Sequence, residues 1–132
     1  MLARFDKSSV LSAAQVAMEI TADTAENEQR GQLAQGLRGD NSFMPDYSRT
    51  SVQFFGKPAG PIRLYDLGDF YRGIKMNVSG DIFNITSTDQ KTTMLENNYG
   101  RDILKLGTQA KINYIRVLKP EYVNTIRNDL KI

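Results

Sequence analysis

An alternation of apolar and polar residues across positions 74–87 constrains the fold more than any other feature of the sequence. Apolar residues occupy every second position of 74–79, the pair Gly80-Asp81 interrupts the run, and 82–87 resumes a strand-like pattern. A period of two is typical of a strand with one buried face. Two turn-forming residues between such runs predict a tight antiparallel hairpin.

The register of this hairpin follows from its turn. A two-residue turn places Val78 opposite Phe83 and Met76 opposite Ile85, so that all four apolar side chains share one face. A shift of one residue would divide them between the two faces. Because an isolated hairpin is only marginally stable, the apolar face requires helices or another sheet against it.

Helical patterns on both sides of the hairpin supply such partners. We expect a helix over 9–29, with an alanine-rich apolar stripe, and another over 89–99. Residues 64–73 favour a short helical turn. The C-terminal segment favours a helix over 108–118 followed by a last helix that starts at Pro120, or else one helix kinked at that proline.

Residues 31–63 are the least regular part of the chain. They contain five of the ten glycines and three of the four prolines, which excludes a long helix or strand, although a short strand is expected around 52–54. Aromatic residues in this stretch argue against free disorder. A structureless loop of this length is uncommon in a compact domain, so we interpret it as an arm that packs on its own domain or on a neighbour.

Together these patterns predict a single α+β domain spanning 1–132. Its small antiparallel sheet is built on the 74–87 hairpin and packs against the N-terminal and C-terminal helices, with a long extended arm or loop at 31–63. The length of 132 residues is close to the commonest domain size, and the apolar share of 40% is lean. A lean core is consistent with stability that is shared with partners.

The residues that usually build enzyme active sites and metal centres are scarce. The chain contains no Cys and no His, which excludes disulfides, thiolate nucleophiles, Ser–His pairs and most zinc sites. Asp66 and Asp69 are the remaining candidates for acid–base chemistry, and capping of a short helix explains them more simply. We therefore expect no enzymatic activity, no cofactor and no metal.

Aromatic residues and one arginine form the candidate interaction surface, because such residues are favoured at protein interfaces. The candidates are the aromatic residues of the arm and a polar-aromatic cluster that follows it: Phe43, Tyr47, Phe54, Phe55, Tyr65, Tyr71 and Arg72. For the cluster at 65–72, packing in the core with a polar rim is an equal alternative.

The charge distribution is uneven, although the net charge is only +2. Residues 1–30 contain three basic and five acidic residues, whereas 101–132 contain seven basic and three acidic residues. Such polarity suits identical subunits that stack head to tail, and it also suits an ordinary solvated surface. Lys111, Arg116 and Lys119 are the candidate DNA-facing residues. No run of about 18 apolar residues occurs, so no membrane-spanning segment is expected.

One ordered set of motifs covers about a third of the chain. Residues 64–74 read Leu-Tyr-Asp-Leu-Gly-Asp-Phe-Tyr-Arg-Gly-Ile, the Gly-Asp hairpin follows, then Thr-Asp-Gln-Lys, and later Tyr99-Gly100. This order resembles small virion proteins of tailed phages, especially phages of Bacteroidetes hosts, including crAss-like phages. It is more distantly similar to tail-completion and head–tail joining proteins, from which it departs at Leu67, where Thr is usual.

The resemblance implies a structural neck or connector subunit at the head–tail junction of a virion, assembled in the host cytoplasm. The implied partners are copies of the chain in a ring, the portal or neighbouring neck and tail proteins, and DNA by non-specific contact. A ring interface joins two different patches. We expect the arm to supply one patch and the acidic first helix or the basic last helix to supply the other. The alternative is a nucleic-acid-binding accessory protein that uses the basic C-terminal helices.

Overall fold

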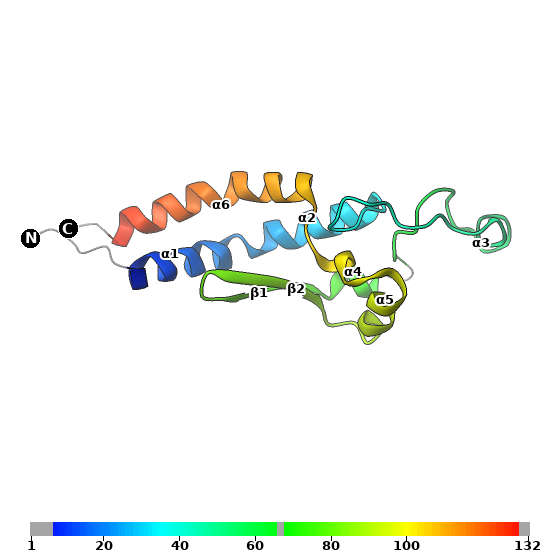
Figure 1. The fold of residues 1–132 in the computed structure, drawn as a ribbon, viewed down its shortest axis with the longest axis horizontal. Helices are drawn as coiled ribbons and strands as arrows, with labels where there is room; N and C mark the ends of the chain where they lie inside the picture. Colours follow the sequence, from blue (N-terminus) through cyan, green and yellow to red (C-terminus); the bar gives the residue numbers. More distant parts are fainter. Residues whose placement is uncertain (1–6, 66–67, 130–132) are drawn as a thin grey trace, which may run out of the picture.

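The computed structural model describes residues 7–65 and 68–129, which form helices and one hairpin along a long axis (Figure 1). The elements are α1 Lys7–Ile20, α2 Ala22–Ala34, α3 Arg49–Phe54, α4 Asp69–Arg72, β1 Ile74–Ser79, β2 Ile82–Ser87, α5 Thr92–Tyr99, a 3₁₀ turn Arg101–Leu104 and α6 Thr108–Asp129. Helix α6 runs along α1 and α2, and the hairpin lies against the other side of these helices (Figure 1). The predicted α+β class is confirmed.

The hairpin has the predicted register. Strands β1 and β2 pair antiparallel, with Met76 opposite Ile85 and Val78 opposite Phe83. Met76 and Ile85 are buried, and Val78 and Phe83 are partly buried against the helices. Gly80 in the turn has a φ of 62°, a conformation that glycine adopts without strain. The alternation in the sequence was therefore sufficient to predict the pairing.

The core lies between the hairpin and the helices. Its largest fully buried side chains include Leu33, Ile74, Ile103 and Tyr114, which come from α2, β1, the 3₁₀ turn and α6. Phe83 packs edge to face on Tyr114, with ring centroids 5.7 Å apart. One cluster of buried residues thus joins segments from both ends of the sequence.

The helix expected over 9–29 is two helices, α1 and α2. The break falls at Thr21, whose hydroxyl donates to the carbonyl of Ala17 at 2.8 Å and lies 2.9 Å from the hydroxyl of Tyr114. A threonine hydroxyl that bonds to a carbonyl one turn earlier tends to bend a helix. The break is therefore tied to a tertiary contact with α6 that the helical periodicity does not reveal.

The arm also differs from the prediction in two respects. Helix α2 continues through Gly31 to Ala34, so the irregular segment begins later than expected. The strand predicted around 52–54 is wrong, because α3 occupies this position. The side chain of Ser48 caps α3 by accepting a hydrogen bond from the N–H of Ser51 at 3.1 Å, which favours a helical turn.

Helix α6 is continuous through Pro120, so the separate last helix is wrong and the single-helix alternative is correct. Helix α5 begins at Thr92 rather than at 89, after a turn in which the Asp89 carboxylate accepts from the N–H of Lys91 at 3.3 Å. Met94, an apolar residue of α5, is 52% exposed.

The short helical turn predicted over 64–73 is present as α4. Its N-cap is Gly68, which has a φ of 81°, and not Asp69, which lies in the first turn. The prediction that Asp69 caps this helix is therefore wrong. Asp66 and Leu67 lie outside the described residues.

Candidate protein interface

The tip of the arm carries apolar side chains that are exposed to solvent. No residue of α3 is buried. Phe54 and Phe55 are each 71% exposed, and Val52 at 36% adds a third apolar side chain. In Figure 1 this segment extends beyond the end of the body formed by α1, α2, α6 and the hairpin. The tip is therefore an apolar surface that its own domain does not cover.

The base of the arm is well anchored. The outgoing and returning chains pair through a hydrogen bond from the N–H of Tyr47 to the carbonyl of Gly60 and another from the N–H of Ile62 to that of Pro45, both at 2.9 Å. Met44 is buried in the core at the start of the arm. The paired base directs the tip away from the body and limits its range of positions.

Glycine is required at one point of this base. A β-carbon on Gly36, which has a φ of 74°, would lie 2.5 Å from the β-carbon of Pro61 on the returning chain. Such an approach is shorter than van der Waals contact allows. The end of α2 and the return of the arm can therefore lie this close only because residue 36 has no side chain.

The remaining arm aromatics lie nearer the body. Phe43 is 65% exposed. Tyr47 is partly buried, and the Nζ of Lys57 lies 5.8 Å from the centroid of its ring. Tyr47 and Tyr65 line one groove of about 280 Å³ together with Leu64 and residues of α5. The structure thus brings these two tyrosines together, but places the phenylalanines of the tip elsewhere.

Tyr71 is a correction to the predicted interface set. Its ring is buried, and its hydroxyl donates to the carbonyl of Arg63 at 2.6 Å. Burial raises the pKa of Tyr71 above its ordinary value, with nearby Tyr47 acting in the same direction. Tyr65 packs edge to face on it with centroids 4.9 Å apart and is itself 56% exposed. Tyr71 therefore supports the exposed ring of Tyr65 from beneath.

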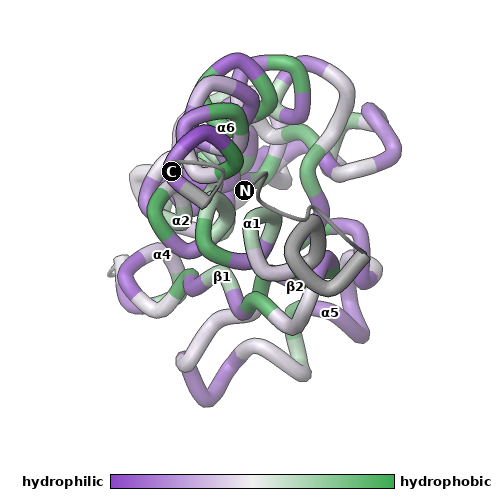
Figure 2. Tube along the Cα trace, turned by 90° about the vertical axis from the view of Figure 1, so that its left-hand side faces the viewer, coloured by the Kyte–Doolittle hydropathy of each residue, from purple (hydrophilic) through white to green (hydrophobic). Residues whose placement is uncertain are grey.

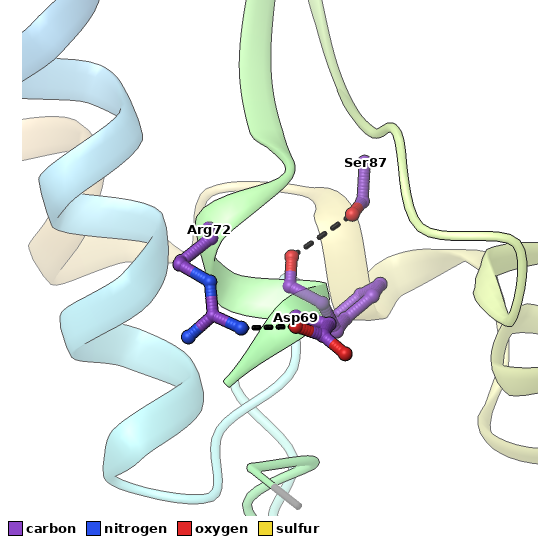
Figure 3. Close-up of polar contacts among 4 residues, drawn as sticks. Asp69, Arg72 and Ser87 are labelled. Carbon is purple, nitrogen blue, oxygen red and sulfur yellow. Dashed lines mark hydrogen bonds and ion pairs between the residues drawn. The ribbon is translucent and has the colours of Figure 1, made fainter. Parts of the chain in front are cut away.

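Arg72 and Asp69 form an exposed ion pair one turn apart on α4 (Figure 3). Nearby, the hydroxyl of Ser87 donates to the carbonyl of Phe70 at 2.9 Å, which ties α4 to the end of β2. Within 7–65 and 68–129, no group of three or more acidic side chains is placed to hold a metal ion. Asp69 thus acts in local structure, and Arg72 is on the surface as predicted.

The three candidate DNA-facing residues do not share one surface. Lys111 lines a groove beside β2, whereas Arg116 and Lys119 line an apolar groove of about 600 Å³ along α6. Two isoleucines of that groove, Ile112 and Ile115, are 41% and 52% exposed. Apolar and polar segments alternate around α6 in the end-on view (Figure 2).

The sequence did not indicate that these isoleucines are exposed, because α6 carries two apolar stripes. Only the stripe that contains Ala110 and Tyr114 packs on α1 and α2. The small and aromatic residues of the buried stripe were the available signal, since close packing between helices favours small side chains. Val52 and Lys57 on the arm were not among the predicted interface residues.

Comparisons with protein families, with curated proteins and with solved structures found no match to this chain. Among the helices that the structure describes, none is both long and apolar enough to cross a membrane.

Proposed function

We propose that this chain is a structural subunit of a tailed-phage virion, a neck or head–tail connector or tail-completion ring protein. It acts at the head–tail junction through contacts with copies of itself, with the portal or with neighbouring neck and tail proteins. The observation that carries the proposal is the arm, which has an anchored base and an apolar tip that covers no part of its own chain.

The physical argument concerns the cost of exposed apolar surface. Val52, Phe54 and Phe55 are exposed within four consecutive positions at the tip, and a concentration of exposed apolar side chains often marks a binding surface. Burial of one phenylalanine contributes about 1.5–3 kcal/mol, so two of them supply much of the energy of a modest interface. A subunit whose exposed tip is covered by neighbouring subunits explains this arrangement. The resemblance of 64–107 to small virion proteins suggests which assembly the subunit belongs to.

The test removes the tip and leaves the base intact. Because Tyr47 and Gly60 are already hydrogen-bonded, residues 48–59 can be replaced by an Asn-Gly dipeptide that closes a short turn. Particle mass is measured across a concentration series, alone and with the purified portal. We expect the full chain to form ring-sized particles, or to bind the portal, and the shortened chain to do neither.

A matched control keeps the arm but changes its polar residues, Arg49→Ala, Thr50→Ala and Gln53→Ala. This variant should assemble like the parent, whereas Val52→Ser with Phe54→Ser and Phe55→Ser should behave like the shortened chain. Assembly that survives both the shortening and the triple serine variant would refute the role of the arm. Absence of the chain from purified virions would refute the assignment to a phage neck.

A second candidate is a nucleic-acid-binding accessory protein. Arg116, Lys119 and Arg127 line the same groove of α6, and none of them has an ionic partner among the described residues. Neutralising all three should abolish a salt-sensitive affinity for DNA, which fluorescence anisotropy at low salt would measure. The isoleucines between these cations favour a protein partner over phosphate.

A further inference from the structure

The two outer edges of the hairpin differ, because side chains of a helix bond to one edge and not to the other. Helix α2 covers the edge of β1: the Oε2 of Glu26 accepts from the N–H of Met76 at 2.9 Å, and the Nη2 of Arg30 donates to the carbonyl of Ile74 at 3.1 Å. Arg30 also donates through Nε to the carbonyl of Tyr71 at 2.9 Å. These side chains take the place of a third strand on this side.

The other edge belongs to β2, and the register identifies which groups point outward. Residues opposite each other in an antiparallel pair direct their N–H and C=O groups either toward the partner or away from it. Since the N–H of Met76 points outward to Glu26, that of Ile85 opposite also points outward, as does that of Phe83 two residues away. No hydrogen bond within the described residues reaches the backbone of Phe83 or Ile85.

Strand β2 lacks the features that usually protect a free edge. Its sequence, Ile-Phe-Asn-Ile-Thr-Ser, contains no charged residue and no proline, and its pairing with β1 contains no bulge. Lysine, proline and bulges are the common means by which proteins prevent another strand from adding to an edge. Ile82 at the start of β2 is 68% exposed. The edge is therefore open to a further strand.

A groove of about 650 Å³ runs beside this edge. It is lined by 83–86 of β2 and by the apolar side chains of Leu104 and Leu106, with charged side chains around them. Asp102 is paired with Lys105 at 3.4 Å, and Asp40 accepts hydrogen bonds from Ser42.

The groove lining carries charges of both signs. Arg101 and Lys111 have no ionic partner among the described residues, and Asp40 and Glu96 are the acidic side chains that remain beside them. A carboxylate of a bound segment can therefore pair with Arg101 or Lys111, while the lining as a whole has no excess charge.

We infer that the outer edge of β2 binds an extended segment of another protein as a third strand. Main-chain hydrogen bonds to Phe83 and Ile85 supply the pairing, apolar residues at alternate positions meet Leu104 and Leu106, and a carboxylate meets Arg101 or Lys111. Backbone groups at the spacing of a strand are recognised best by another strand, which defines the class of occupant. The site is separate from the arm and does not depend on a virion role.

The test uses the full chain and a synthetic peptide with blocked ends, Glu-Val-Thr-Val-Thr-Val-Glu. Amide hydrogen exchange is followed by NMR while the peptide is titrated to its solubility limit. We expect exchange at Phe83 and Ile85 to slow by about tenfold once the free peptide exceeds its Kd about tenfold. Exchange at Met76, which is already bonded to Glu26, should not change.

Two controls separate strand addition from loose adsorption. A peptide methylated on alternate amides so that it cannot pair should give no protection. The variant Arg101→Glu with Lys111→Glu changes only exposed side chains and should prefer a peptide with Lys in place of Glu. Protection that is equal with the methylated peptide, or absent with the parent peptide, would overturn the inference. Protection of Phe83 and Ile85 in the chain alone that disappears on dilution would show that a second copy occupies the edge instead.

Discussion

The body and the arm contain similar apolar residues but use them in opposite ways. In the body, Ile74 and Tyr114 are almost fully buried, whereas Phe54 and Phe55 at the arm tip are 71% exposed. The difference arises from position and not from composition. The body residues lie where two helices meet a hairpin, and the tip lies at the end of a ribbon whose paired base keeps it away from both. Exposure in a well-anchored segment points to a partner.

The largest expected effect is a difference in the free energy of unfolding between two variants that each shorten an apolar side chain. Ile74→Ala leaves a cavity in the core and should lower the free energy of unfolding by about 2–5 kcal/mol. Phe54→Ala removes a larger side chain from the tip and should change it by less than about 0.5 kcal/mol. Urea unfolding followed by circular dichroism measures both. Similar losses in the two variants would mean that the tip packs on its own body.

The next effect concerns the covered edge of the hairpin. Glu26→Ala leaves the buried N–H of Met76 without a partner and should cost about 1–3 kcal/mol. Glu26→Gln keeps an acceptor at the same place and should recover most of the loss. The exposed Glu19→Ala is the matched control and should have almost no effect on urea unfolding. A loss in the Ala variant that the Gln variant does not recover would contradict this role for Glu26.

The loss of stability at high pH should also arise from residues of the body. Burial raises the pKa of Tyr71 and of Tyr114 above the ordinary value of 10.0. Below pH 10 both phenols are neutral in the folded and unfolded states, so their contribution to the free energy of unfolding is complete. Above pH 10 the phenols ionise first in the unfolded state, so the free energy of unfolding falls as the pH rises toward the folded pKa values. Urea unfolding at pH 8 and about pH 11 should show a smaller loss for Tyr71→Phe with Tyr114→Phe than for the parent.

The smallest effect on the folded structure should follow cleavage of the arm. Arg49 lies in α3, which has no buried residue, so brief trypsin treatment should cut the chain there early. The two fragments should remain associated, with the circular dichroism of the intact chain, and their unfolding midpoint should now depend on protein concentration because unfolding also separates two chains. Mass spectrometry locates the cut. Early cleavage within the hairpin or α6 instead would show that the arm is the more protected region.

Local patterns were enough to predict some elements and not others. The hairpin was predictable to the residue because one turn and four alternating apolar side chains allow a single register. The long irregular arm was predictable from its glycines and prolines. The break at Thr21 was not, since it coincides with a hydrogen bond to Tyr114, which is 93 residues away.

The candidate surfaces show the same division. The exposed phenylalanines of the arm were identified from composition alone, and their exposure agrees with a role outside the domain. For Tyr71 the burial supports core packing, the equal alternative for this cluster, because tyrosine is common both at interfaces and at the margin of a core. The exposure of Ile112 and Ile115 was not predictable, because periodicity identifies an apolar face without showing whether anything covers it.

The sequence by itself determined the α+β class, the hairpin and its register, and the existence of an aromatic arm, since each depends on residues close together in the chain. Only the tertiary structure decided which stripe of α6 is buried, that α2 covers the edge of β1, and that the edge of β2 remains open. These features depend on which of several similar surfaces meet. That choice is made by packing between distant segments, where Glu26, Arg30 and Tyr114 find their partners.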